Sequence, residues 1–209
     1  MKVAIIGASG FVGSAILNEA LNRGHVVTAI VRNPEKISIT NPNLKVIKAD
    51  VTNTEEVTRA VTGNEAVISS YSSFDKDTYV TAINAVIDGI RKAGIKRLLA
   101  VSGAGSLEVA PGVQMLDTPS FPAEWKGGAL ATREAFYVIR QQNDLDWTVF
   151  SPAAVIAPGE RTGKFRLGKD QLVTDTDGNS KISTADYAIA MIDELEKPQH
   201  IKARFTIAY

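Results

Sequence analysis

The sequence predicts an α/β fold in which strand–helix–strand units build a parallel sheet. Short apolar runs rich in valine and isoleucine alternate with longer segments whose apolar residues recur at helical spacing. Several of the helical segments stop at a glycine, which is typical of a helix C-terminus. The run at residues 26–31 is almost entirely apolar or β-branched. That composition is expected of a strand covered on both faces, as strands of parallel sheets are.

The same periodicities place the elements in order along the chain. The predicted strands cover residues 3–6, 26–31, 44–49, 66–69, 97–101 and 147–150. The predicted helices between them cover residues 14–23, 54–61, 77–93 and 125–142. Residues 106–123 contain three prolines and little periodicity, so we expect a long loop there. A loop of this length in a compact domain is often functional.

The chain after residue 152 no longer shows this regular alternation. It predicts a loop, a β-hairpin around residues 175–178, a helix at 184–196 and a final strand at 204–208. The Asp-Gly pair at 177–178 favours a hairpin turn over a calcium loop, whose glycine and final glutamate would need other positions. No stretch resembles a linker, so we expect one domain, residues 1–209, with a small C-terminal cap at residues 153–183.

Composition excludes several classes of protein. Basic and acidic residues number 23 each, and this zero net charge gives no reason to expect a nucleic-acid partner. The chain has no cysteine, which rules out disulfides, a thiolate nucleophile and cysteine-ligated metals, and we expect no metal site. It shows neither a signal peptide nor an apolar run of about 18 residues, so we expect a cytoplasmic protein without a membrane partner. A monomer or a homodimer is compatible with this charge.

The most informative motif lies between the first strand and the first helix, where glycines are spaced as G-x-x-G-x-x-G. A first glycine permits a sharp turn, a second lets backbone approach a pyrophosphate, and a third lets the helix pack close to the sheet. The helix N-terminus then faces the anion. The motif predicts a nicotinamide dinucleotide site; a glycine turn without ligand is the alternative. Its residues are Gly7, Ala8, Ser9, Gly10, Phe11, Val12 and Gly13.

The end of the second strand predicts which dinucleotide is preferred. A site for NAD(H) tends to place a carboxylate there for the ribose hydroxyls. This chain has Arg32 at that point, whose planar guanidinium suits a 2′-phosphate. We therefore expect NADP(H) to be preferred over NAD(H), with a solvated strand-end charge as the alternative.

Polar residues follow the other strands, and ligands of open α/β sheets lie beyond the carboxyl ends of strands. Asp50 could meet the adenine amino group while Val51 packs on the ring, although Asp50 could also simply cap a loop. The remaining residues that we expect in the cofactor site by position are Ser69, Ser70, Tyr71, Ser102, Gly103 and Pro152.

Together, the glycine loop, Val31-Arg32, Asp50-Val51 and residues 93–102 resemble the atypical branch of the short-chain dehydrogenase/reductase superfamily. Residues 182–188 and 204–207 are similar to the end of the NmrA-like and biliverdin-reductase-B-like proteins, a group often described as NADH–flavin reductases. The resemblance covers nearly the whole chain. It implies a Rossmann-type fold, a doubly wound parallel sheet with helices on both faces.

One departure from the superfamily changes the expected chemistry. Most members reduce carbonyls with a Tyr-x-x-x-Lys pair, and no tyrosine of this chain is followed by lysine four residues later. Hydride transfer from NADPH to flavin, or to a similar conjugated acceptor, needs no such acid because the proton can come from solvent. By resemblance, Ser102 corresponds to a serine beside the nicotinamide, and we expect it to orient the substrate. Flavin is then a substrate and not a prosthetic group.

The acceptor is expected to be a small molecule held under an apolar lid. Tyr71, Phe121 and Trp125 could line this pocket, although the last two could equally belong to the core. His25 and His200 are expected at the surface, so a histidine-activated serine hydrolase is not favoured. A non-catalytic, NmrA-like redox sensor is the alternative function. A sugar-nucleotide epimerase fits less well, since the tail is short and the tyrosine is missing.

Overall fold

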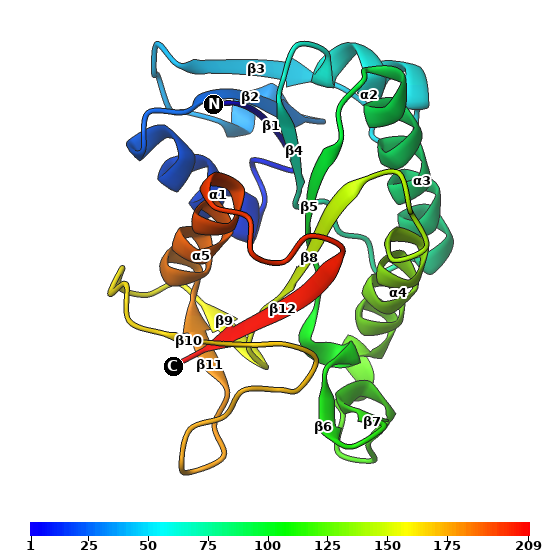
Figure 1. Ribbon diagram of the computed structural model, residues 1–209, viewed down its shortest axis with the longest axis vertical. Helices are drawn as coiled ribbons and strands as arrows, with labels where there is room; N and C mark the ends of the chain where they lie inside the picture. The colour runs from blue at the N-terminus through cyan, green and yellow to red at the C-terminus, as the bar shows by residue number, and fades with distance from the viewer.

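A computed structural model describes all 209 residues, and an eight-stranded sheet forms its centre (Figure 1). The strand order is β10-β12-β8-β5-β4-β1-β2-β3, and every neighbouring pair is parallel except β10 with β12. The strands are β1 (Lys2–Ile6), β2 (Val26–Val31), β3 (Leu44–Lys48), β4 (Ala66–Ser69), β5 (Arg97–Val101), β8 (Asp146–Ser151), β10 (Arg166–Gly168) and β12 (Ala203–Ala208). The predicted Rossmann-type, doubly wound sheet is confirmed.

Five helices cover the two faces of this sheet, as Figure 1 shows with α1 and α5 on one side and α2, α3 and α4 on the other. They are α1 (Phe11–Asn22), α2 (Thr54–Val61), α3 (Lys76–Lys92), α4 (Ala123–Ile139) and α5 (Thr184–Glu196). The strand β1 shows why its sequence is continuously apolar. Val3 and Ile5 belong to the core beneath α1 and α5, while Ala4 and Ile6 belong to the core on the other face.

The chain reverses direction across the sheet between β1 and β4. From β1 it moves outward through β2 to β3, then returns past β1 to β4 and continues through β5 and β8. Loops that leave two neighbouring strands in opposite directions open a crevice at their carboxyl ends, which is where α/β proteins bind ligands. The glycine loop after β1 and residues 70–74 after β4 flank this crevice.

Three expectations about individual elements were wrong in part. Helix α1 begins at Phe11, three residues before the predicted start, because the second half of the glycine loop already has helical backbone. Residues 106–123 are not one loop, since they hold the antiparallel pair β6 (Glu108–Ala110) and β7 (Val113–Gln114) and a 3₁₀ turn, Met115–Asp117. The turn at 175–178 exists, closed by a bond from the Gly178 amide to the Asp175 carbonyl, but no β-hairpin flanks it.

The region predicted as a cap, residues 153–183, contributes strands both to a small separate sheet and to the main sheet. The short strands β9 (Val155–Ala157) and β11 (Lys181–Ser183) pair in parallel beside the main sheet, whereas β10 extends the main sheet as its antiparallel edge. No helix in the structure is long and apolar enough to cross a bilayer.

Asp186, in the first turn of α5, fastens this region to the domain. Its fully buried carboxylate accepts hydrogen bonds from the Thr162 amide and hydroxyl, at 2.8 and 2.6 Å, from the Gly163 amide and from the Tyr209 hydroxyl. Burial opposes ionisation, but these donors outweigh it and hold the pKa of Asp186 below its ordinary value. Ser183 caps the same helix through the Asp186 amide and donates to the Glu160 carbonyl.

Replacing Asp186 by asparagine is expected to lower the free energy of unfolding at neutral pH by about 2 kcal/mol, because hydrogen bonds to a charged acceptor are lost. A depressed native pKa stabilises the fold above the unfolded value, roughly pH 4, and this contribution disappears as the pH falls through the native pKa. Denaturant titrations should therefore show the Asp186→Asn deficit shrinking below about pH 4. The exposed Asp177→Asn serves as control; an unchanged deficit at acid pH would contradict this role.

Candidate functional site

The glycine loop is built so tightly that side chains cannot replace its first and third glycines. Gly7 has a φ of +76°, and an added Cβ would lie 2.7 Å from the carbonyl oxygen of Ser70. At Gly13 an added Cβ would lie 2.1 Å from the carbonyl oxygen of Gly7. Gly10 is less constrained, with 3.2 Å to the same oxygen. The loop, the start of α1 and the end of β4 therefore form one closely packed unit.

The start of α1 has donors that no side chain of the protein satisfies. Gly10 is its N-cap, makes no side-chain capping bond, and the first turn contains no acidic residue. Unpaired amides and the positive end of the helix dipole favour an anion at this point. Together with the space that the glycines leave, these residues fit the pyrophosphate of a dinucleotide.

The predicted ribose and adenine contacts lie at the neighbouring strand ends. Arg32 follows β2 and is exposed. The Asp50 carboxylate after β3 accepts from the Thr52 amide at 2.9 Å and hydroxyl at 2.7 Å, so the loop-capping alternative is also realised. These bonds, and the positive charge of Arg32, hold the pKa of Asp50 below its ordinary value. Val51 is buried in the core. A role for any of them in cofactor binding stays a prediction.

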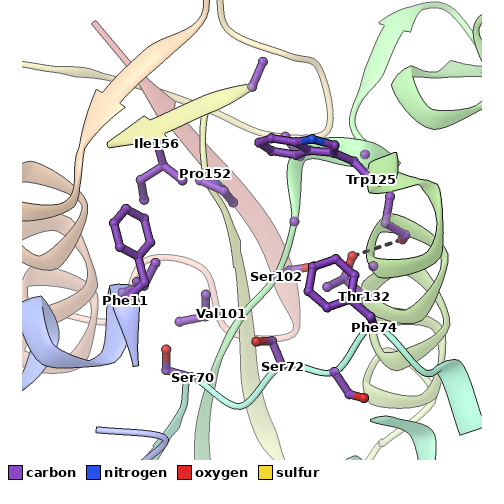
Figure 2. Close-up of a pocket in the computed structure, with 18 of the residues that line it drawn as sticks. Phe11, Ser70, Ser72, Phe74, Val101, Ser102, Trp125, Thr132, Pro152 and Ile156 are labelled. Atoms are coloured by element: carbon purple, nitrogen blue, oxygen red, sulfur yellow. Dashed lines mark hydrogen bonds between the residues drawn. The ribbon is translucent and has the colours of Figure 1, made fainter. Parts of the chain in front are cut away.

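An apolar cleft of about 490 Å³ opens at the carboxyl ends of β1, β4, β5 and β8 (Figure 2). Of its 26 lining residues, 15 are hydrophobic. In Figure 2, Phe11 projects from the α1 side, Trp125 and Phe74 lie on the α4 side, and Ser102 lies between them. Of the predicted residues, those that line this cleft are Gly10, Phe11, Val12, Ser70, Tyr71, Ser102, Gly103, Phe121, Trp125 and Pro152.

The other predicted residues lie outside the cleft. Gly7, Ala8, Ser9 and Gly13 shape the loop, Ser69 is buried in β4, and Arg32, Asp50 and Val51 lie toward the β2–β3 edge. Trp125 is mostly exposed at the cleft and is not a core residue, in contrast to the buried Trp147. Cleft residues that sequence reasoning missed include Ser72, Ser73, Phe74, Met115, Glu124, Thr132 and Ile156. Residues 72–74 had a signal, since they directly follow the predicted site residues 69–71, and Met115 lies in the segment 106–123 that was expected to be a functional loop.

Ser102 has a side-chain oxygen without a partner. Its amide donates to the Phe150 carbonyl at 2.9 Å, which fixes the residue at the end of β5. The Ser102 Oγ is buried in the wall of the cleft and forms no hydrogen bond within the protein. Buried hydroxyls are normally satisfied by protein, water or ligand atoms, and this one has no protein partner.

The two buried tyrosines beside the cleft, Tyr79 and Tyr187, are not prepared to act as proton donors of the Tyr–Lys kind. Burial raises the pKa of Tyr79, and it raises the pKa of Tyr187 well above the ordinary value. The Tyr187 hydroxyl is already committed to the Phe150 carbonyl at 2.6 Å. No lysine lines the cleft that could lower either pKa.

The two histidines take no part in the cleft. The expectation of a surface position is wrong for His25, which is buried between the N-terminal amino group, 3.3 Å from its Nδ1, and Glu196, 3.0 Å from its Nε2. His200 is half-buried, with its Nδ1 2.8 Å from the Glu194 carboxylate. Neither ring can activate Ser102.

Comparison with known proteins identifies the family. A model of NAD(P)H-binding domains matches residues 7–198. The chain belongs to the NAD(P)H-binding family. Membership in the NAD(P)H-binding family supports oxidoreductase chemistry in general terms, and it agrees with the dinucleotide geometry of the glycine loop.

Several known proteins are similar to this chain over nearly their whole length. The uncharacterized protein YwnB of Bacillus subtilis (strain 168) is 41% identical over 99% of this chain and 98% of its own. A crystal structure of a "putative epimerase" from Bacteroides thetaiotaomicron is 51% identical with a TM-score of 0.96, covering 100% of this chain and 96% of its own. A "putative NADH-flavin reductase" from Streptococcus pneumoniae TIGR4 is 39% identical with a TM-score of 0.86, covering 100% and 99%.

Proposed function

We propose that this protein is an NADPH-dependent reductase that transfers a hydride to flavin or a related conjugated acceptor. The observation that carries the proposal is the apolar cleft, continuous with the glycine loop, in which the Ser102 Oγ is buried without a partner. A dinucleotide bound on the loop would direct its reactive end toward this cleft, as ligands of doubly wound sheets lie across the strand ends.

The chain's own residues hold and orient two flat molecules. When bound, NADPH supplies the hydride, and the acceptor takes up one solvent proton, so that the acceptor is reduced by two electrons and the cofactor is oxidised. The glycine loop binds the phosphates, and Arg32 prefers the 2′-phosphate. The Ser102 hydroxyl orients a polar atom in the cleft, while the aromatic side chains exclude water. No proton donor of the protein is needed.

Two further points support this acceptor class. The Streptococcus relative carries the description of an NADH-flavin reductase, and it matches this chain from end to end. Epimerisation, which the Bacteroides description suggests, would need acid–base groups at the substrate carbon. The cleft offers neither a Tyr–Lys pair nor a histidine.

Steady-state oxidation of NADPH in the presence of FMN, FAD, riboflavin and quinones tests the proposal. We expect turnover above background with at least one of them. Tight dinucleotide binding without turnover of any acceptor would contradict it and would favour an NmrA-like sensor.

Ser102→Ala is expected to lower kcat about tenfold with a smaller change in the NADPH dissociation constant, because one orienting hydrogen bond is lost. Ser151 provides a matched control, since its Oγ is also buried and unpartnered but does not line the cleft. Ser151→Ala should retain the wild-type rate. Equal losses in both variants would assign the effect to packing and not to orientation.

A further inference from the structure

We infer that the cleft selects an uncharged planar acceptor over a phosphorylated one, and that Glu124 is the residue that enforces this selection. The inference rests on the proposed function, whose acceptor class it narrows. Riboflavin and FMN carry the same ring system and differ by one phosphate, so they separate the two cases.

The residues that line the cleft carry negative charge but no positive charge. Among its lining residues there is no lysine, arginine or histidine, and Glu124 is the single acidic one. Among the cations on the surrounding elements, Lys126 is exposed in the first turn of α4 but does not line the cleft, and two arginines are engaged elsewhere. Arg133 on α4 bonds to Asp117 at 3.2 Å, and Arg204 bonds to Asp170 at 2.7 Å. A phosphate held in this cleft would therefore lose hydration without gaining a counter-charge.

Glu124 also occupies the second helix N-terminus at the cleft, the first being that of α1, where the pyrophosphate of the dinucleotide is predicted to bind. Helix α4 begins at Ala123, beside the cleft, and its N-cap Pro122 makes no side-chain capping bond. The positive end of such a helix attracts phosphate. Glu124 is an acidic side chain in this first turn, exposed at the edge of the cleft. Its charge offsets the helix dipole and repels a second anion.

The apolar parts of the cleft mouth fit a flat ring. Three large aromatic side chains there remain exposed: Phe74 by 79%, Trp125 by 63% and Phe11 by 56%. Figure 2 shows Phe11 on one side of the cleft and the other two on the α4 side. The Phe74 ring rests on α4 at Gly128, where an added Cβ would lie 3.2 Å from it. Exposed aromatic rings at a cleft are typical of sites that stack a planar ligand.

The decisive experiment compares kcat/KM for riboflavin and FMN with NADPH in the wild-type protein and in Glu124→Lys. We expect the wild type to favour riboflavin. We expect Glu124→Lys to raise the ratio of kcat/KM for FMN to kcat/KM for riboflavin by roughly fivefold, and to lose this gain at high salt. Glu124→Gln should give an intermediate gain. Asp177→Lys makes the same charge change in an exposed turn away from the cleft. It should alter kcat/KM for neither riboflavin nor FMN.

The outcomes separate the inference from the function on which it rests. Turnover with FMN equal to or better than riboflavin in the wild type overturns the inference and leaves the reductase function standing. The inference is also overturned, and the reductase function again left standing, if Glu124→Lys changes kcat/KM for riboflavin and FMN by the same factor. Absence of turnover with riboflavin, FMN, FAD and quinones alike would overturn the proposed function itself.

Discussion

Gly13→Ala is expected to reduce dinucleotide affinity by roughly 30- to 100-fold and to lower the free energy of unfolding by about 2 to 3 kcal/mol. The added Cβ would lie 2.1 Å from the Gly7 carbonyl oxygen, a backbone atom that no side-chain rotation can move away. Helix α1 would have to shift outward from the loop, and its amides would leave the position from which they can reach a pyrophosphate. Fluorescence titration with NADPH and denaturant unfolding measure the two effects.

The adjacent Ser14→Ala provides the control. Ser14 lies one residue further along the same helix, and its hydroxyl donates only to the Phe11 carbonyl at 3.3 Å. We expect its dinucleotide affinity and stability to remain close to those of the wild type. Wild-type NADPH affinity in Gly13→Ala would show that the loop does not bind the phosphates.

The second large effect concerns cofactor choice. Arg32→Ala should weaken NADPH binding by roughly 10- to 100-fold, since a hydrogen-bonded ion pair with a phosphate contributes about 1.5 to 3 kcal/mol. NADH lacks this phosphate and should lose less than about twofold. Titration of both cofactors against both proteins gives the comparison.

Arg59→Ala controls for net charge in that experiment. Arg59 is exposed on α2, and its replacement by alanine removes the same single positive charge. It should change the affinity for neither cofactor by more than about twofold. An equal loss of NADPH and NADH in Arg32→Ala would instead assign Arg32 to the solvated strand end.

The parts of the fold that could be predicted from sequence are those where local chemistry determines structure. The β1 run is apolar at consecutive positions because its alternate residues enter the two cores on opposite faces of the sheet. The glycine loop was predictable for a similar reason, since Gly7 has a left-handed backbone and Gly13 is in contact with a carbonyl. In both cases the local environment, burial on both faces or the lack of space for a Cβ, restricts which residue type can stand at that position.

The parts that could not be predicted depend on partners far away in the chain. The backbone at 106–115 is ordered by long-range contacts: the Glu108 amide bonds to the Asp170 carbonyl, and Arg204 reaches the Ser106 carbonyl and hydroxyl. The acidic Asp186 is buried because residues 162, 163 and 209 supply its donors. No local pattern contains this information.

The cleft shows the same division. Residues directly after strands were predicted by position, whereas Glu124 and Thr132 enter the site only because α4 packs beside the 3₁₀ turn Ala104–Ser106. Gly103 permits this approach, since an added Cβ would lie 2.9 Å from the Thr132 Oγ1. The side of α4 that faces the site follows from this packing, which helical periodicity does not specify.

An anaerobic single-turnover experiment tests the central claim most directly. Enzyme loaded with one equivalent of NADPH is mixed with riboflavin, and the nicotinamide and flavin absorbances are followed together. We expect both absorbances to decay with one shared rate constant, much faster than in a mixture without enzyme, and the amounts of NADPH oxidised and riboflavin reduced to be equal once the absorbances are converted to concentrations. NADPH that stays bound and reduced while riboflavin stays oxidised would contradict it.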